Sequence, residues 1–230
     1  MAQSWHDLLF VHWPVPAEVL RRLIPSGLEL DTFDGAAWVG VVPFRMTGIR
    51  ARGTPALPRL SAFPEINVRT YVRQRDPQDP RPGVYFFSLD AAHRLAVAAA
   101  RALYRLPYFL AEMDCRDDGH NIHYASRRIH PRAAAAEFRG SYRPCGEAAA
   151  VQPRCLEHWL VERYRLYTAH GDRMWAGDIH HRPWPLQPAE AEIRHNSMAD
   201  AAGIALPGSA PLLHFARQLD VLIWPLRRIA

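Results

Sequence analysis

The sequence predicts a mostly β, α+β fold, and three observations carry this prediction. Short apolar or alternating stretches follow one another along most of the chain, as expected for strands. Turn sequences rich in Asp and Gly separate several of them, at positions 34–35, 117–119 and 170–172. Helical periodicity is confined to a few short segments. Because no long linker divides the 230 residues, we expect one domain spanning 1–230.

The first third of the chain alternates strand patterns with proline and glycine. An apolar strand is expected at 8–13, and a short helix at 17–23 follows it because proline is favoured at a helix start. Strands at 28–33 and 36–44 flank Asp-Gly, a strong hairpin signal. The stretch 50–59 is rich in Pro, Gly and Arg and is expected to be a surface loop.

The centre of the chain predicts a strand, a helix and a second strand in succession. Residues 84–89 are apolar, and Asp90 follows where an N-cap carboxylate would accept amide protons. The alanine-rich stretch 91–105 favours helix, and Pro107 ends it. This leaves Tyr108 directly at the helix exit. The apolar stripe of the helix consists of Leu95, Ala98, Ala99, Ala102 and Leu103.

The second half of the chain returns to strands joined by tight turns. Strands at 109–116 and 120–127 flank Asp-Asp-Gly, and strands at 166–168 and 174–180 flank His-Gly-Asp. Apolar residues at helical spacing predict a helix after Pro153. The remaining elements are this helix at 154–163, a helical turn at 196–201, and strands at 136–143, 186–194, 212–216 and 219–226.

The strand expected at 65–73 has an unusual side-chain pattern. Alternation places Glu65, Asn67, Arg69 and Tyr71 on one face and apolar side chains on the other. An acid, an amide, a guanidinium and a phenol do not form an ordinary core face. Either the face is solvated, or it lines a pocket in which the charges are paired, because an unpaired buried charge is costly.

Three stretches carry a family resemblance: HWPVPAEVLRRLIPSGLELDTFDGAAWVGVVPF at 12–44, FPEINVRTYV at 63–72 and HHRPWPLQPAEAEI at 180–193. They resemble the YqjF-like family of uncharacterised proteins, a lysine-free branch of the acetoacetate decarboxylase superfamily. The resemblance implies a curved, largely antiparallel β-barrel or cone with a few covering helices and an internal pocket. It also implies that the acidic residue of the strand at 65–73 lies in the cavity. It implies no established reaction.

The resemblance departs from the decarboxylases at the helix exit. There a lysine pair follows the exit proline, and one lysine forms a Schiff base with the keto acid; the matching positions here are Tyr108 and Phe109. All 28 residues counted as Lys+Arg are arginine. A Schiff base needs a primary amine, which arginine does not supply. Schiff-base decarboxylation by a side chain is therefore excluded.

The predicted site combines these two regions. Glu65 and Tyr108 are the candidate catalytic residues, and Asn67, Arg69 and Arg101 are the candidate ligand-binding residues. Glu65 would be a general base or acid and Tyr108 a proton donor, acting without an imine. The predicted ligand is a small organic molecule that is acidic or carries a carbonyl. The alternatives are a lyase or isomerase type of enzyme and a non-catalytic ligand sensor or structural protein.

Composition narrows the expected partners. The net charge of +5 comes from scattered arginines without a basic run, so no nucleic-acid partner is expected. No apolar run approaches the length of about 18 residues that suggests a membrane span, so no membrane partner is expected. Three cysteines without a CxxC pair favour a reducing, cytoplasmic location. The 12 histidines include Asp178 with His180 on one strand face but no HExxH, so no metal or other cofactor is expected. The sequence leaves open whether the protein forms a homo-oligomer.

Overall fold

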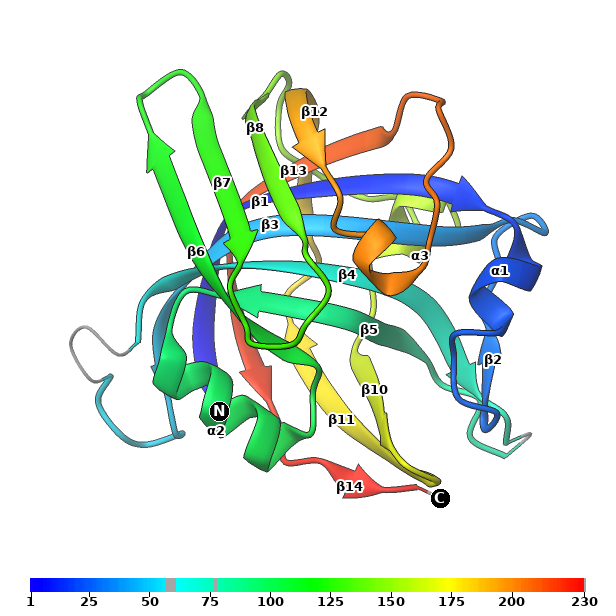
Figure 1. Ribbon diagram of the computed structural model, residues 1–230. Coiled ribbons are helices and arrows are strands. Elements are labelled where there is room, and N and C mark those ends of the chain that lie inside the picture. Colours follow the sequence, from blue (N-terminus) through cyan, green and yellow to red (C-terminus); the bar gives the residue numbers. More distant parts are fainter. Residues whose placement is uncertain (57–60, 77, 230) are drawn as a thin grey trace.

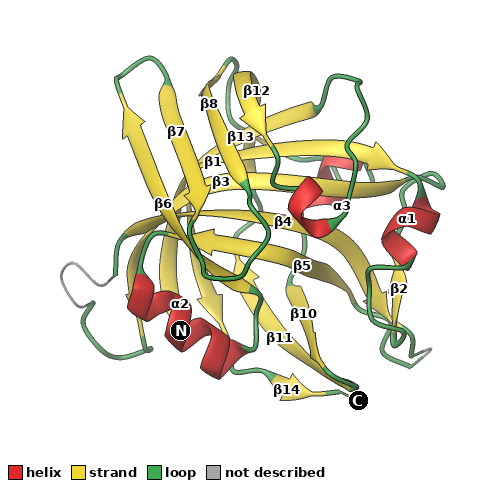
Figure 2. Ribbon diagram, in the orientation of Figure 1, coloured by secondary structure: helices red, strands yellow, loops and turns green. Residues whose placement is uncertain are grey.

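The computed structural model describes residues 1–56, 61–76 and 78–229 (Figure 1). The end of the loop expected at 50–59 therefore lies outside the described residues. Figure 2 shows a molecule built mainly of strands, with three short helices packed against a curved sheet. The predicted mostly β fold with a few covering helices is confirmed.

The elements follow one another in the order that Figure 1 colours from blue to red. The helical segments are α1 (Ala17–Arg21), α2 (Arg94–Tyr104), α3 (Leu156–Val161) and the 3₁₀ turn η1 (Asp200–Ala202). The strands are β1 (Ala2–Val15), β2 (Leu28–Leu30), β3 (Ala37–Arg50), β4 (Phe63–Gln74), β5 (Pro82–Ala91), β6 (Tyr108–Asp117), β7 (Ile122–Arg128), β8 (Glu137–Pro144), β9 (Ala149–Ala150), β10 (Arg165–His170), β11 (Arg173–His181), β12 (Pro185–Asn196), β13 (Leu212–Ile223) and β14 (Arg227–Arg228).

The strand pairings among the described residues close on themselves twice. One closed path, which we call the cavity ring, runs β4–β5–β10–β11–β13–β1–β3. The other, the second ring, runs β4–β5–β6–β7–β8–β12–β13–β1–β3. The strands β13, β1, β3, β4 and β5 belong to both rings and form what we call the shared wall. Most pairings are antiparallel, but β5 pairs in parallel with β6 and with β10.

The two faces of the shared wall bury two different apolar cores. On β1, Leu8 and Phe10 belong to the core inside the cavity ring, whereas Leu9 and Val11 belong to the core inside the second ring. This follows from the two-residue period of a strand, which sends neighbouring side chains to opposite faces. Because both faces are covered, the run of apolar residues in β1 is nearly continuous.

A bulge in β1 keeps this alternation in phase with the core. Trp5 and Leu8 both pack in the cavity-ring core although three residues separate them. The extra residue falls at Asp7, whose φ is 55°, and the pairing of β1 with β3 shifts register after His6. An added residue in one strand restores the facing of the side chains that follow it.

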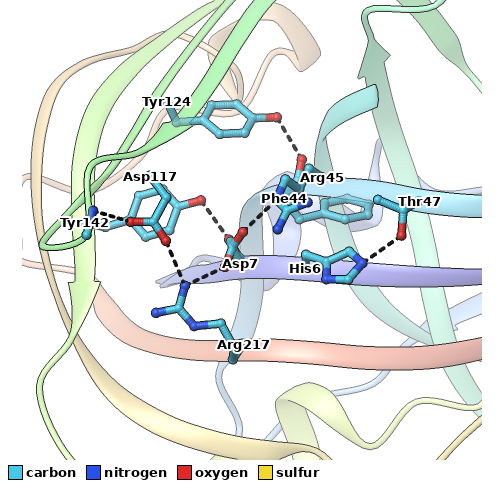
Figure 3. Close-up of polar contacts among 10 residues, drawn as sticks. His6, Asp7, Phe44, Arg45, Thr47, Asp117, Tyr124, Tyr142 and Arg217 are labelled. Atoms are coloured by element: carbon cyan, nitrogen blue, oxygen red, sulfur yellow. Dashed lines mark hydrogen bonds and ion pairs between the residues drawn. The ribbon is translucent and has the colours of Figure 1, made fainter. Parts of the chain in front are cut away.

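The side chain and backbone of Asp7 together fix the bulge through contacts from three elements (Figure 3). Its carboxylate accepts hydrogen bonds from Arg45 on β3 and Arg217 on β13, each at 2.7 Å. Its backbone carbonyl accepts a hydrogen bond from the Tyr142 hydroxyl at 2.7 Å. The carboxylate is 3% exposed, so these bonds supply the partners that water would supply elsewhere.

Two expected strand arrangements are wrong. The Asp-Gly turn at 34–35 forms, with a bridge between Phe33 and Ala36, but β2 pairs with β4 instead of β3. The two strands expected at 212–216 and 219–226 are one strand, β13. Its partner changes along its length, from β12 near Phe215 to β11 near Ile223.

Asp90 is not the helix N-cap that the sequence predicted. It lies on β5, and its carboxylate forms a two-pronged ion pair with Arg128 at 2.7 Å. The helix starts later, at Arg94, and the His93 ring accepts the hydrogen bond of the Ala96 amide. The cap prediction failed because a partner 38 residues away competes with the local helix start.

The helix α2 also buries a different face from the apolar stripe that the sequence predicted. Leu95 and Leu103 are 66% and 72% exposed, and Val97 is the buried residue. The face carrying Ala96 and Ala100 lies against the end of the cavity ring. In the described part of the chain, no helix is long and apolar enough to cross a membrane.

The buried Asp90–Arg128 pair is predicted to contribute strongly to stability. Both side chains are at most 3% exposed, so Asp90→Asn leaves a guanidinium without a counter-charge in the interior. We expect a loss of unfolding free energy on the order of 3–5 kcal/mol. The matched control is Glu190→Gln, which breaks the exposed pair with Arg143 and should cost less than about 1 kcal/mol. Urea denaturation measures both; equal losses contradict the prediction.

Candidate functional site

The polar face of β4 lines a small cavity of about 60 Å³, which we call the inner cavity. Glu65, Asn67 and Arg69 reach it from β4, and Tyr108 reaches it from the first residue of β6. Four of the five residues predicted from the sequence therefore lie together. Most of the remaining lining is apolar and includes Trp5, Leu8, Phe44, Phe86, Leu106 and Trp184.

Glu65 is buried and has an unusual protonation equilibrium. Its side chain accepts a hydrogen bond from the Tyr108 hydroxyl at 2.8 Å, and its backbone carbonyl accepts one from Tyr124 at 2.6 Å. Burial raises the pKa of Glu65 to about 8; the Tyr108 hydrogen bond opposes this shift and the charge of Asp90 adds to it. A carboxyl group with such a pKa can give and take protons near neutral pH.

Tyr108 remains a phenol rather than a phenolate. Burial and the adjacent Glu65 carboxylate raise the pKa of Tyr108 well above its usual value. Its hydroxyl donates its hydrogen bond to Glu65.

Asn67 and Arg69 each present an unpaired polar atom in the interior. Neither Asn67 Oδ1 nor Arg69 Nε has a hydrogen-bond partner among the described residues. The Arg69 guanidinium lies over the rings of Phe10 and Tyr71, at 5.4 and 5.8 Å from their centroids. The expected pairing of Arg69 with Glu65 does not form, because the Glu65 side chain binds Tyr108 instead.

Arg69 differs in this respect from the other buried arginines. Arg128, Arg163 and Arg165 have side chains at most 4% exposed, and each contacts a carboxylate. Their partners are Asp90, Asp31 and Asp178. Within the described part of the chain, Arg69 has no carboxylate partner. Arg69 therefore lines the inner cavity without a counter-ion from the residues that the structure describes.

Sequence reasoning missed a buried His12–Tyr71 pair behind Arg69. Both side chains are fully buried, and the Tyr71 oxygen lies 2.6 Å from His12 Nε2. Burial first, and then the charge of Arg69, lower the pKa of His12 well below its usual value, so the imidazole is neutral. The alternation of β1 places His12 on the face of Leu8 and Phe10, a signal that could have found it.

Gly40 makes room for this pair. The sequence predicts a bulge or a close backbone approach at Gly40, because glycine inside a strand often has that role. A Cβ atom at position 40 would lie 3.0 Å from two ring atoms of His12 and 3.5 Å from the Tyr71 hydroxyl. The close approach is therefore made by a side-chain ring rather than by another backbone.

The structure does not bring Arg101 into the inner cavity. Its side chain is exposed on the outer side of α2 and donates a hydrogen bond to the backbone carbonyl of Tyr108 at 2.7 Å. Its guanidinium also lies 5.9 Å from the centre of the Phe109 ring. Arg101 can thus hold the chain at the helix exit without contacting a ligand in the inner cavity.

The histidine and cysteine side chains outside the inner cavity do not gather into a metal site in the described part of the chain. No group of three or more His, Cys, Asp or Glu with a metal-site arrangement occurs in residues 1–56, 61–76 and 78–229. Asp178 binds Arg165, and His181 Nδ1 lies 2.8 Å from the Arg182 carbonyl. The three cysteines are free thiols.

Comparison with known proteins gives the family. The family DUF2071, an uncharacterized conserved protein, matches residues 2–220. The chain belongs to the DUF2071 family. It is also 51% identical over 228 residues to the uncharacterized protein YqjF of Bacillus subtilis (strain 168), covering 99% of this chain and 92% of that protein. The resemblance to the YqjF-like family predicted from the sequence is confirmed.

Solved structures similar to this DUF2071 member show the fold. The enduracididine biosynthesis enzyme MppR with HEPES bound superposes with a TM-score of 0.69 at 13% identity, covering 100% of this chain and 87% of MppR. Acetoacetate decarboxylase from Legionella pneumophila subsp. pneumophila str. Philadelphia 1 gives a TM-score of 0.63 at 12% identity, with coverage of 100% and 87%. The acetoacetate decarboxylase-like fold is confirmed.

Removing the Tyr108 hydroxyl should change the ionisation of Glu65. Because the Tyr108 hydrogen bond favours the charged form of Glu65, we expect Tyr108→Phe to raise the Glu65 pKa above about 8. A ¹³C NMR titration of the Glu carboxyl signals measures this value. Tyr104→Phe, which removes a nearby hydroxyl that does not bond to Glu65, should leave it unchanged. A lower Glu65 pKa in Tyr108→Phe contradicts the prediction.

Glu65 should also make the stability depend on pH. Between its ordinary pKa of 4.5 and about 8, the folded protein keeps a proton that the unfolded chain has released. The unfolding free energy therefore falls as the pH rises through this window, by up to about 1.4 kcal/mol per pH unit.

Glu65→Gln cannot ionise and should flatten this slope, whereas exposed Glu190→Gln should not. Urea denaturation at several pH values across the window compares the two variants with the unaltered protein. Parallel stability curves for Glu65→Gln and the unaltered protein would show that Glu65 titrates normally.

Proposed function

We propose that the inner cavity binds a small organic acid that carries a carbonyl, such as a 2-oxo acid, and that Glu65 exchanges a proton with the carbon next to the ketone. The observation that carries the proposal is that Arg69, which has no carboxylate partner among the described residues, lines the same cavity as a carboxyl group with a pKa of about 8. A ligand carboxylate would supply the missing counter-ion.

The remaining polar atoms fit the same ligand. The carboxylate and keto oxygens of a 2-oxo acid are adjacent, so one guanidinium fork can contact both. The Asn67 Oδ1 atom can accept a hydrogen bond from the hydroxyl of the enol form. At about 10–15 Å³ for each water-sized volume, the inner cavity of about 60 Å³ has room for a few non-hydrogen atoms.

The proposed step is an enolisation without an imine. The Glu65 carboxylate takes a proton from the carbon next to the ketone, and the electrons of that C–H bond form the enolate. Arg69 stabilises the negative oxygen, and the proton on Glu65 returns to carbon or exchanges with solvent. Tyr108 keeps the Glu65 carboxylate oriented through its hydrogen bond. MppR, a structural neighbour, has been solved with pyruvate, a ligand of this class.

Deuterium exchange into pyruvate tests the proposal. In D₂O the protein should accelerate the loss of the pyruvate methyl signal in ¹H NMR, with a rate that rises with pH through about 8 as Glu65 ionises. Glu65→Gln should abolish the acceleration and change pyruvate affinity by less than about tenfold. Arg69→Met should weaken pyruvate binding by at least about tenfold, because a charge-assisted hydrogen bond is lost.

The matched control for Arg69 is Arg143→Met, which removes an exposed arginine bound to Glu190 and should change neither quantity. Pyruvate binding without accelerated exchange supports the alternative, a ligand sensor on the same scaffold. Unchanged pyruvate affinity in Arg69→Met rejects the proposed site. The predictions of one domain, a cytoplasmic location and a homo-oligomer stay predictions.

A further inference from the structure

A second, larger space adjoins the inner cavity. We call it the outer cavity; it measures about 190 Å³ and lies between α2 and the end of the cavity ring. The residues that line both spaces are Gln3, Met46, Leu106, Tyr108, Leu166 and Ile223. Tyr108 thus stands at the junction, with its hydroxyl bound to Glu65 in the inner cavity. The shared walls make the two spaces neighbouring parts of one site.

The two spaces differ sharply in chemistry. The inner cavity contains an acid, an amide and a guanidinium, whereas the outer cavity has no charged side chain in its lining. The N-terminal ammonium group of Met1, which also lines the outer cavity, donates a hydrogen bond to the Ile223 carbonyl at 2.7 Å. Ile49 and Phe63 form one side of the outer cavity, and the small side chains of Ala96 and Ala100 form the α2 side. Larger residues on α2 would fill this space, so the alanines keep it open.

The rim of the outer cavity carries an apolar side chain that the fold leaves uncovered. Leu103 lines the outer cavity from α2 and is 72% exposed. Its burial by a ligand would remove apolar surface from water, which favours binding. An apolar group that enters from this side and ends in a polar head at Tyr108 would use both cavities.

We infer that the ligand of this protein is an oxo acid with an apolar tail, whose head occupies the inner cavity and whose tail occupies the outer cavity under α2. This inference rests on the proposed function and adds the substrate class. A two-carbon or three-carbon head alone would leave the outer cavity to water. Each methylene of a tail would instead gain contact with the side chains of Met46, Phe63 and Ala100.

A series of straight-chain 2-oxo acids tests the inference. The probes are pyruvate, 2-oxobutanoate, 2-oxopentanoate, 2-oxohexanoate and 2-oxooctanoate, with binding measured by isothermal titration calorimetry. Affinity should rise by about fourfold for each methylene until the outer cavity is full. Ala100→Leu fills the outer cavity and should weaken 2-oxooctanoate binding by about tenfold or more, while changing pyruvate affinity by less than about threefold.

The control and the outcomes separate this inference from the proposed function. Ala98→Leu adds the same group to the opposite side of α2, beside Arg101 and His130, and should change neither affinity. If pyruvate binds and longer acids bind no better, the tail site is wrong and the proposed function stands. If Arg69→Met binds 2-oxooctanoate unchanged, or neither acid binds the unaltered protein, both ideas are rejected.

Discussion

The position of β4 in a wall shared by two rings is the constraint on which the candidate site depends. One face of β4 must be apolar, because Ile66 and Val68 pack in the core of the second ring. The other face is thereby directed into the cavity ring, and Glu65 and Arg69 have no route to bulk solvent on the far side. A slip of one residue would exchange the two faces, so the apolar core fixes the register of the polar site. The Tyr124 hydroxyl bond to the Glu65 carbonyl ties the second ring to the same point.

Interior charges in this structure are either paired with an opposite charge or left without such a partner. The charges without a partner line the candidate site. Asp7 and Asp90 are fully buried, and both carboxylates are bound by arginines, so their charges support the fold. Glu65 is buried and Arg69 is partly buried, but the two side chains are not paired with each other. An unsatisfied interior group lowers stability, and the folded protein retains it only because other contacts compensate. Such groups are also arranged before a ligand arrives, which reduces the reorganisation needed on binding.

Sequence patterns identified the local parts of this site and failed where distant partners decide the outcome. The two-residue period of β4 was sufficient to group Glu65, Asn67 and Arg69, and Pro107 was sufficient to place Tyr108 at a helix exit. The expected position of Arg101 in the cavity does not form, because the rotation of α2 depends on packing against the ring and helical periodicity does not encode this rotation. The prediction of Asp90 as a helix N-cap was wrong because Asp is typical of an N-cap, whereas its actual partner, Arg128, is distant in sequence. The pairing of β2 is also non-local: β2 pairs with β4 beyond Thr70, where the pairing of β4 with β3 ends, and the turn at 34–35 does not encode this partner.

The absence of lysine side chains and the raised pKa of Glu65 both bear on how the site could act on a carbonyl. Without a side-chain amine, the site has no covalent electron sink from a side chain, so the carbonyl ligand that we propose would be held by charge and hydrogen bonds alone. Such a site needs a cation for the oxygen and a base whose pKa is near that of its surroundings, and burial supplies the second requirement at Glu65. A phenol at position 108 fits this arrangement better than an amine would. A charged ammonium beside Glu65 would favour the carboxylate and return its pKa toward the ordinary value, whereas the neutral Tyr108 hydroxyl orients Glu65 and leaves its pKa near 8.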